Sequence, residues 1–292
     1  MEGLPQEQKE SLERGKNVEI VLKFLRHGER DKEGRLTDYG RSVTAERARE
    51  SGIKPDDFDA VKAIGSNAGE KAGVGKRAFE TADIYAHTIA GDGAFNSRVE
   101  KVLSFEGLKN SVPYDHVEIY NASLPENFNS LSNEEKAVAA KKAQAAVIDH
   151  LINLDTPEAD AYRDEMAGAF AYLIEHYRKM TKKLKSGSKV LLPAGTHGGV
   201  MEFLLQKALV RTDKDGNEVI GFKNSKEIGG EFSPSEAYNV DIVTDENGDY
   251  KPLMVSFDTK SRGMDGKLYL DENKIKELAE FYESLHSEPN GL

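Results

Sequence analysis

The stretch Val18-Glu19-Ile20-Val21-Leu22-Lys23-Phe24-Leu25 runs directly into Arg26-His27-Gly28-Glu29 near the start of the chain. An apolar run of this length without proline is typical of a buried strand. In α/β proteins, reactive side chains are exposed where such a strand ends and the chain turns. Imidazole can attack phosphorus, guanidinium binds phosphate oxygens in a fork, and glycine lets the backbone approach a ligand. The stretch therefore predicts a buried strand with a candidate anion site at its carboxyl end.

Composition narrows the class of protein. The 292 residues are 38% hydrophobic and 31% charged, which is enough for a buried core under much solvated surface. A net charge of −11 argues against a general nucleic-acid-binding or anionic-membrane-binding protein. Cysteine is absent, which excludes disulfides, thiolate metal ligands and a cysteine nucleophile. Residues 1–16 are polar and lack a signal-peptide core, so we expect a flexible N-terminus and a cytoplasmic protein without a membrane span.

Strand and helix patterns alternate over the next part of the chain. Thr37 or Asp38 is a suitable N-cap for a helix running to about residue 51, and residues 60–64 form a short apolar run. A second helix is expected over 76–90 and a further strand over 98–105. Such alternation indicates βαβ units and a largely parallel sheet.

From about residue 107 to 186 the pattern changes to long helices. Two alanine-rich segments, 133–154 and 157–184, have helical periodicity with charges between the apolar positions. We interpret residues 107–186 as a helical insertion that covers or flanks the sheet. Another strand is expected at 189–193, followed by a helix that runs to about residue 209.

The last third of the chain contains three hairpin signals, Asp215-Gly216, Asn247-Gly248 and Asp265-Gly266. Segments 240–243 and 253–257 are expected to pair across the second signal, and a last amphipathic helix is expected over 272–286. Residues 17–292 are therefore predicted to form a single α/β domain. Its expected architecture is a three-layer α/β/α sandwich with a mostly parallel sheet and a helical insertion.

Candidate catalytic residues occur at strand ends and helix starts that are distant in the sequence. An isolated Arg-His-Gly tripeptide is more often an ordinary turn, so its meaning depends on the other pieces. The set that we select has two arginines, two histidines and one carboxyl group: Arg26, His27, Arg77, Glu106 and His197. Ligand sites of α/β proteins form at these places, and this set matches what phosphoryl transfer through a phosphohistidine needs.

Physical requirements assign a role to each member of the set. The two guanidinium groups of Arg26 and Arg77 can bind the phosphoryl oxygens, and a protonated His197 could donate a further hydrogen bond. His27 must present an unprotonated nitrogen to phosphorus while its other nitrogen donates to a backbone carbonyl. Glu106 could protonate the leaving alkoxide and later deprotonate water. This scheme uses no metal ion and no other cofactor.

The motifs around these residues resemble those of the histidine phosphatase superfamily, also called phosphoglycerate mutase-like, in its branch 1 of cytoplasmic mutases and phosphatases. The resemblance covers about residues 18–90 and 189–243. It is carried by Arg26-His27-Gly28-Glu29, Leu36-Thr37 with Gly40, Ser66, Arg77-Ala78 with Thr81-Ala82, Thr196-His197-Gly198-Gly199-Val200 and Asn239. Carried over by position, it implies that His27 is the phosphorylated nucleophile and that Arg26, Arg77 and His197 form the phosphate pocket. Glu106 matches only by its place after the third strand.

Two departures bear on the kind of activity. Arg30 and Glu33 stand where mutase-like members carry a small hydroxyl residue and an asparagine, and the loop from Glu29 to Leu36 is shorter than in mutases. We therefore predict a phosphatase acting on a phosphorylated small molecule or a phosphoprotein. Mutase-like phosphotransfer and a non-catalytic, phospho-ligand-binding relative are the alternatives. The substrate and the oligomeric state are not readable, and either Glu106 or Glu29 could be the proton donor.

Two other patterns point to different chemistry and are set aside. Residues 69–77 are similar to a P-loop, but Glu70 replaces the first glycine and Arg77 replaces the hydroxyl residue after the lysine. The remaining histidines show no metal-ligand spacing, so we expect structural or exposed roles for His87, His116, His150, His176 and His286.

Overall fold

A nine-stranded sheet forms the centre of the computed structural model, which describes residues 13–31, 33–68, 76–104, 108–111, 115–213, 215–258, 262, 264 and 266–287. The strand order is β3-β2-β4-β1-β7-β8-β9-β5-β6. The strands are β1 (Glu19–Arg26), β2 (Ala60–Gly65), β3 (Phe95–Val99), β4 (Lys189–Thr196), β5 (Leu209–Thr212), β6 (Glu218–Ile220), β7 (Ala237–Val243), β8 (Met254–Phe257) and β9 (Tyr269–Leu270).

The strands that carry the sequence motifs are parallel. β1 pairs with β4, β4 with β2, and β2 with β3, all in the parallel sense. From β7 onward the sheet continues as antiparallel pairs. The expected pairing across Asn247-Gly248 is confirmed as the β7–β8 pair, and β5 pairs with β6 across Asp215-Gly216. Asp265 of the third hairpin signal lies outside the described residues.

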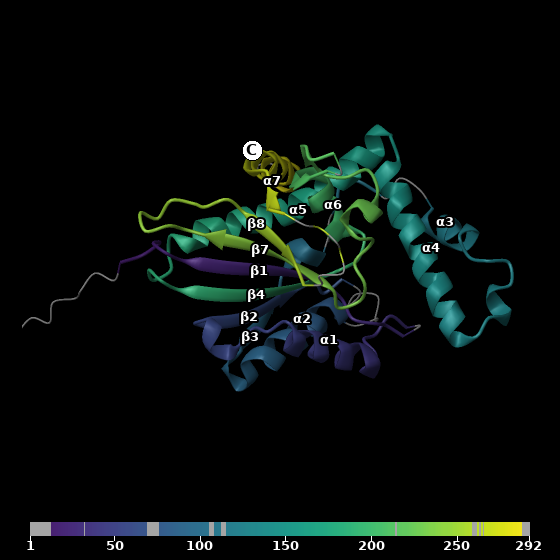
Figure 1. The fold of residues 1–292 in the computed structure, drawn as a ribbon, viewed down its shortest axis with the longest axis horizontal. Coiled ribbons are helices and arrows are strands. Elements are labelled where there is room, and N and C mark those ends of the chain that lie inside the picture. Colours follow the sequence, from purple (N-terminus) through teal and green to yellow (C-terminus); the bar gives the residue numbers. More distant parts are fainter. Residues whose placement is uncertain are drawn as a thin grey trace, which may run out of the picture.

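Helices cover both faces of the sheet, so the predicted three-layer α/β/α arrangement is confirmed (Figure 1). α1 (Asp38–Glu50) and α2 (Arg77–Ala90) lie on one face, and α5 (Pro157–Thr181), α6 (Val200–Ala208) and α7 (Glu272–His286) lie on the other. α3 (His116–Ala122) and α4 (Asn133–Asn153) project beyond the end of the sheet at which β1 finishes. Short 3-10 turns occur at Pro55–Asp57, Gly91–Gly93, Lys101–Ser104, Phe128–Ser130 and Ser225–Ile228.

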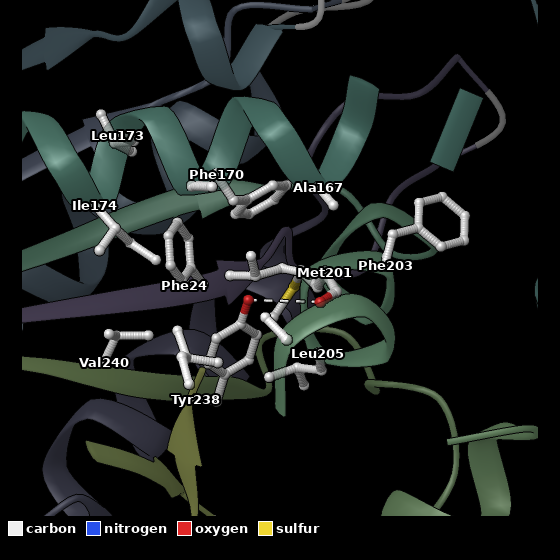
Figure 2. Close-up of a cluster of buried hydrophobic side chains, with 14 of the residues drawn as sticks. Phe24, Ala167, Phe170, Leu173, Ile174, Met201, Phe203, Leu205, Tyr238 and Val240 are labelled. Atoms are coloured by element: carbon white, nitrogen blue, oxygen red, sulfur yellow. Dashed lines mark hydrogen bonds between the residues drawn. The ribbon is translucent and has the colours of Figure 1, made fainter. Parts of the chain in front are cut away.

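β1 is buried on both faces, because its alternate side chains enter two different hydrophobic cores. Ile20, Leu22 and Phe24 belong to the core beneath α5, α6 and α7, whereas Val21 and Leu25 belong to the core beneath α1 and α2. Figure 2 shows the larger core, where the ring of Phe24 meets that of Phe170 edge-on at 4.7 Å between centroids. The Tyr238 hydroxyl donates to the Met201 carbonyl at 3.4 Å, which ties β7 to α6.

Local signals fix the helix starts that matter for the site. Thr37 caps α1, as predicted, by accepting a hydrogen bond from the Gly40 N–H at 2.9 Å. α4 begins with a capping box in which Ser132 and Glu135 bond each other's backbone N–H groups. α5 begins at Pro157 after the Thr156 cap.

One predicted element is wrong. The strand expected over 98–105 is β3 at Phe95–Val99, followed by the 3-10 turn Lys101–Ser104. The Glu100 N–H still donates to the Gly65 carbonyl at the end of the neighbouring strand β2, but the Leu103 N–H then donates to the Glu100 carbonyl. Leu103 and Ser104 are buried by this turn rather than by a strand.

Two further expectations concern the ends of elements and of the chain. α5 ends at Thr181, three residues before the predicted end, and it lies directly over the sheet as part of one layer. The N-terminal backbone is already tied to the domain at Gly15, whose N–H donates to the Leu184 carbonyl at 3.0 Å. Residues 1–12 lie outside the described part of the chain. In the described ranges, every helix is too short or too polar to cross a bilayer.

Candidate functional site

The ends of two neighbouring parallel strands bring the two His-Gly motifs together. Arg26, the last residue of β1, is the register partner of Thr196, the last residue of β4. The His27 N–H donates to the Thr196 carbonyl at 2.9 Å. The rings of His27 and His197 therefore lie side by side, with centroids 5.4 Å apart and an angle of 61° between their planes.

His27 is held in one tautomer. Its ring is buried, and Nδ1 lies 2.7 Å from the Gly28 carbonyl oxygen. A carbonyl only accepts, so Nδ1 carries the proton and the lone pair is on Nε2. Burial is the main cause that lowers the pKa of His27 well below its ordinary value, and the nearby His197 and Arg77 lower that pKa further. The imidazole is therefore neutral near pH 7, with its Nε2 lone pair available for attack.

Close packing explains why glycine follows His27 and why the Leu-Thr-x-x-Gly motif accompanies it. A Cβ at Gly28 would lie 2.6 Å from Leu36 Cδ1, and one at Gly40 would lie 2.6 Å from the Glu29 carbonyl oxygen. The Gly28 N–H also donates to Thr81 Oγ1 of α2 at 2.9 Å. The two helix motifs therefore hold the turn that carries His27.

Two guanidinium groups border the imidazole pair. Arg26 Nη1 donates to the Phe232 carbonyl, and Arg77, the first residue of α2, donates through Nη1 to the Gly34 carbonyl at 3.1 Å. The buried Nε of each has no hydrogen-bond partner among the described residues. Burial, first of all, lowers the pKa of both arginines. Repulsion from Arg30 and Arg26 lowers the pKa of Arg77 further, whereas carboxylates near Arg26, Glu202 foremost, partly offset the effect of burial there. Such incompletely paired guanidinium groups are typical of an anion-binding site.

Arg30 adds to this positive charge. It is exposed, and its backbone forms a bridge with Leu36 that closes the short loop after the first motif. Its charge contributes to lowering the pKa values of Arg26, Arg77 and His197. In the sequence, Arg30 was notable only as a departure from the mutase pattern. In the structure it lies near Arg26, Arg77 and His197, the candidate phosphate-binding residues.

His197 is neutral in this arrangement. Its Nε2 lies 3.1 Å from Ser66 Oγ at the end of β2, and that hydroxyl also accepts from the Ala68 N–H at 3.0 Å. Burial, followed by the charges of Arg77 and Arg26, lowers the pKa of His197 to about 4. The charged donor expected from the sequence therefore requires a bound anion, because an adjacent dianion would raise this pKa. A neutral His197 can still donate one N–H.

Glu202 on α6 is a site residue that the sequence did not indicate. Its side chain is fully buried and accepts from the Gly199 N–H at 2.9 Å and from the Phe232 N–H at 3.1 Å. It thus fixes both the second His-Gly motif and the segment whose carbonyl holds Arg26. Burial raises the pKa of Glu202, while those N–H donors and the charge of Arg26 lower it. One feature of the sequence could have indicated this role: Glu202 lies three residues after Gly199, at the position of a capping-box glutamate.

The predicted proton donors are placed differently. Glu106 lies outside the described residues, so its role stays a prediction. The segment after it is anchored by buried Glu165 of α5, which accepts from the backbone N–H groups of Lys109 and Asn110, each at 2.8 Å. Glu29 is exposed, and its carbonyl oxygen accepts from the Thr37 N–H at 3.0 Å.

The structure thus brings four of the five predicted site residues to one edge of the sheet. The P-loop-like stretch falls mostly on residues 69–75, which lie outside the described residues. Within the described part of the chain, no three His, Asp or Glu side chains are grouped as a metal site. A separate cavity of about 1110 Å³ lies near β5 and the start of α5, and none of the four site residues lines it. Its charged lining includes the ion pairs Arg211–Glu227 and Lys207–Asp160.

Comparisons with known proteins find likeness among solved structures alone. No protein-family model and no curated protein matches this sequence. The native structure of mycobacterial glucosyl-3-phosphoglycerate phosphatase is 14% identical, with 81% of this chain and 96% of that chain covered and a TM-score of 0.36. Its complex with inorganic phosphate is 16% identical, with 75% and 88% covered and a TM-score of 0.34. Both TM-scores are low, so the likeness carries no argument about function, and the site's own residues must carry it.

Proposed function

We propose that this protein is a metal-independent phosphatase that hydrolyses phosphomonoesters through a phosphohistidine intermediate on His27. The observation that carries the proposal is the state of His27: Nδ1 donates to the Gly28 carbonyl, and burial keeps Nε2 unprotonated. A neutral imidazole near two incompletely paired guanidinium groups is suited to attack a bound dianion.

The first step transfers the phosphoryl group to the protein. The Nε2 lone pair of His27 forms a bond to phosphorus while the bond from phosphorus to the ester oxygen breaks. Arg26 and Arg77 hold the equatorial oxygens, on which charge is spread in the transition state. The leaving alkoxide takes a proton from a nearby acid, for which Glu106 is the sequence-based candidate.

The second step releases phosphate. Water attacks the phosphorus of phospho-His27, the same carboxylate takes the proton from that water, and the bond to Nε2 breaks. His27 returns as a neutral imidazole, and inorganic phosphate leaves. The two guanidinium groups neutralise the phosphoryl charge in both steps, so the scheme does not call on a metal ion.

The test compares the wild type with His27→Ala, using p-nitrophenyl phosphate in the presence of EDTA. His87→Ala is the matched control, because His87 is an exposed histidine on α2. We expect His27→Ala to lose about a thousandfold or more of kcat/KM and His87→Ala to retain wild-type turnover.

Other outcomes favour the alternatives. Turnover that persists in His27→Ala contradicts the mechanism. Absence of wild-type turnover on p-nitrophenyl phosphate and on a panel of phosphomonoesters, with phosphate still bound, favours a non-catalytic binding protein. Isomerisation of phosphoglycerate without net release of phosphate favours a mutase.

A further inference from the structure

A small apolar cavity lies beside the proposed phosphate site. Its volume is about 240 Å³, it is partly open to solvent, and it is bordered by α3 and the projecting helix α4 together with the start of α5 and of α6. Most of its lining is apolar, contributed by Val147, Ile148, Leu151, Tyr162, Val200 and Phe203. Phe203 lies at the α6 end of the larger core (Figure 2), and α4 projects past the carboxyl end of β1 (Figure 1). The cavity therefore lies between the helical arm and the edge of the sheet that carries His27.

The wall nearest the site is the glycine pair of the second His-Gly motif. Gly198 packs directly on Arg26, because a Cβ built there would lie 2.6 Å from the guanidinium Nε. A Cβ at Gly199 would lie 3.9 Å from Ile148 Cγ1 of α4. One peptide unit therefore separates the cation proposed to hold the phosphoryl group from the apolar side chains of the arm.

We propose that this cavity binds the leaving group and that the substrate is a phosphomonoester whose alcohol carries one apolar ring. This inference rests on the proposed function, since it places the phosphoryl group at Arg26 and His27. An apolar cavity of about 150 Å³ accepts benzene, so the volume here suits one six-membered ring with a short linker. A polyol in the same place would set most of its hydroxyl groups against Val147, Ile148 and Leu151, whose side chains offer no hydrogen-bond partner.

Two polar side chains also line the cavity and refine the class of substrate. His116 of α3 and half-buried Gln144 of α4 are both part of its lining. An imidazole and an amide can each donate to and accept from a polar group on the ring. The fitting leaving group is therefore a ring with one polar substituent. His116, expected from the sequence to be structural or exposed, gains a contact role in this proposal.

The experiment compares benzyl phosphate with glycerol 1-phosphate, two esters of primary alcohols, in EDTA. We expect kcat/KM to favour benzyl phosphate by about tenfold to a hundredfold, which corresponds to about 1.4–2.8 kcal/mol. The unreactive probes benzylphosphonate and methylphosphonate, tested by calorimetry, report binding without turnover. Benzylphosphonate is expected to bind more tightly by a similar factor.

Variants of α4 locate the effect. Gln144→Phe fills the cavity and is expected to lower kcat/KM for benzyl phosphate at least about tenfold, and to lower kcat/KM for glycerol 1-phosphate by a smaller factor. The matched control is Lys142→Phe, at an exposed position on the same helix, which should change neither value. If Gln144→Phe does not fold, Ile148→Ala enlarges the cavity and should improve naphthylmethyl phosphate relative to benzyl phosphate.

Each outcome separates the inference from the proposed function. Equal wild-type preference for the two esters, with turnover dependent on His27, overturns the ring-binding inference and leaves the phosphatase proposal in place. Tighter binding of benzylphosphonate that is lost in Gln144→Phe, without turnover of any ester, supports the cavity and overturns the phosphatase proposal. Failure of both phosphonates to bind overturns both.

Discussion

A methyl group added at Gly198 tests whether the position of the Arg26 guanidinium matters for phosphate binding. In Gly198→Ala the new Cβ would lie 2.6 Å from Arg26 Nε and 2.7 Å from Cζ, whereas ordinary contacts begin at 3.4 Å. The guanidinium must therefore move by about 0.8 Å, the difference between those contact distances. Its Nη1 bond to the Phe232 carbonyl limits the directions in which it can move.

The expected result is a loss of activity with little loss of stability. The colliding atoms are the end of a flexible side chain, so the substitution should lower the free energy of unfolding by no more than about 1 kcal/mol. Displacement of a phosphate-binding group by about 1 Å can lower a rate about a hundredfold. We therefore expect kcat/KM for p-nitrophenyl phosphate to fall between about tenfold and a hundredfold.

The assay combines steady-state kinetics with thermal unfolding. Gly93→Ala is the matched control, because a Cβ there would meet nothing within 4 Å. The reasoning is refuted if Gly198→Ala folds with an unchanged Tm and keeps wild-type kcat/KM, since Arg26 could then be displaced without consequence. A large drop in Tm would show instead that the collision is absorbed by the backbone.

Two further predictions concern stability. Because the folded state lowers the pKa of His27 well below 6.5 and that of His197 to about 4, the unfolded chain binds more protons below about pH 6.5. The stability that these groups contribute is present above that pH and is lost as the pH falls, by up to about 1.4 kcal/mol per pH unit for each imidazole. In urea unfolding, the free energy of unfolding should therefore fall less between pH 7 and pH 5 for His197→Gln than for the wild type. An identical fall in the two proteins would contradict the lowered pKa of His197. Glu165→Ala leaves the N–H groups of Lys109 and Asn110 without their acceptor, so it should lower the free energy of unfolding by about 2–4 kcal/mol in urea titrations, whereas an unchanged midpoint would rule out this anchoring role.

Much of the fold could be predicted from local sequence patterns, and the structure shows the physical reason for each. The apolar run before Arg26 is a buried strand because its alternate residues face two separate cores. Thr37 caps α1 because threonine at that place can accept the free N–H of Gly40. The Asn247-Gly248 turn pairs β7 with β8 because glycine adopts the positive φ of 88° that this tight turn requires.

Other features depend on tertiary contacts that no local pattern contains. The apolar residues around Leu103 were interpreted as part of a strand, but they are buried by a 3-10 turn because β2 ends at Gly65. Glu202 was missed because its role requires Gly199 and Phe232 to meet in space. The cavity at α4 was unpredictable for the same reason, since its walls come from four helices, α3 to α6, and from Gly198 and Gly199, which meet only in the folded chain.

For the candidate site, the residues could be predicted from the sequence but their protonation states could not. Motif order was enough to select Arg26, His27, Arg77 and His197, and the structure brings these four together. Sequence could not supply the protonation states, because they depend on burial and on the mutual distances of the four groups. His197 in particular is neutral without an anion, although the sequence scheme assigned it a charged role.

The central claim is that His27 becomes phosphorylated during turnover. Rapid quenching of the wild type with ³²P-labelled phosphomonoester should give an acid-labile, base-stable label, at most one per chain, which peptide mass spectrometry locates at His27. The label should form and decay at rates compatible with kcat, and His27→Ala should carry none. Turnover by the wild type without any such label at His27, or an equal label in His27→Ala, would contradict the account.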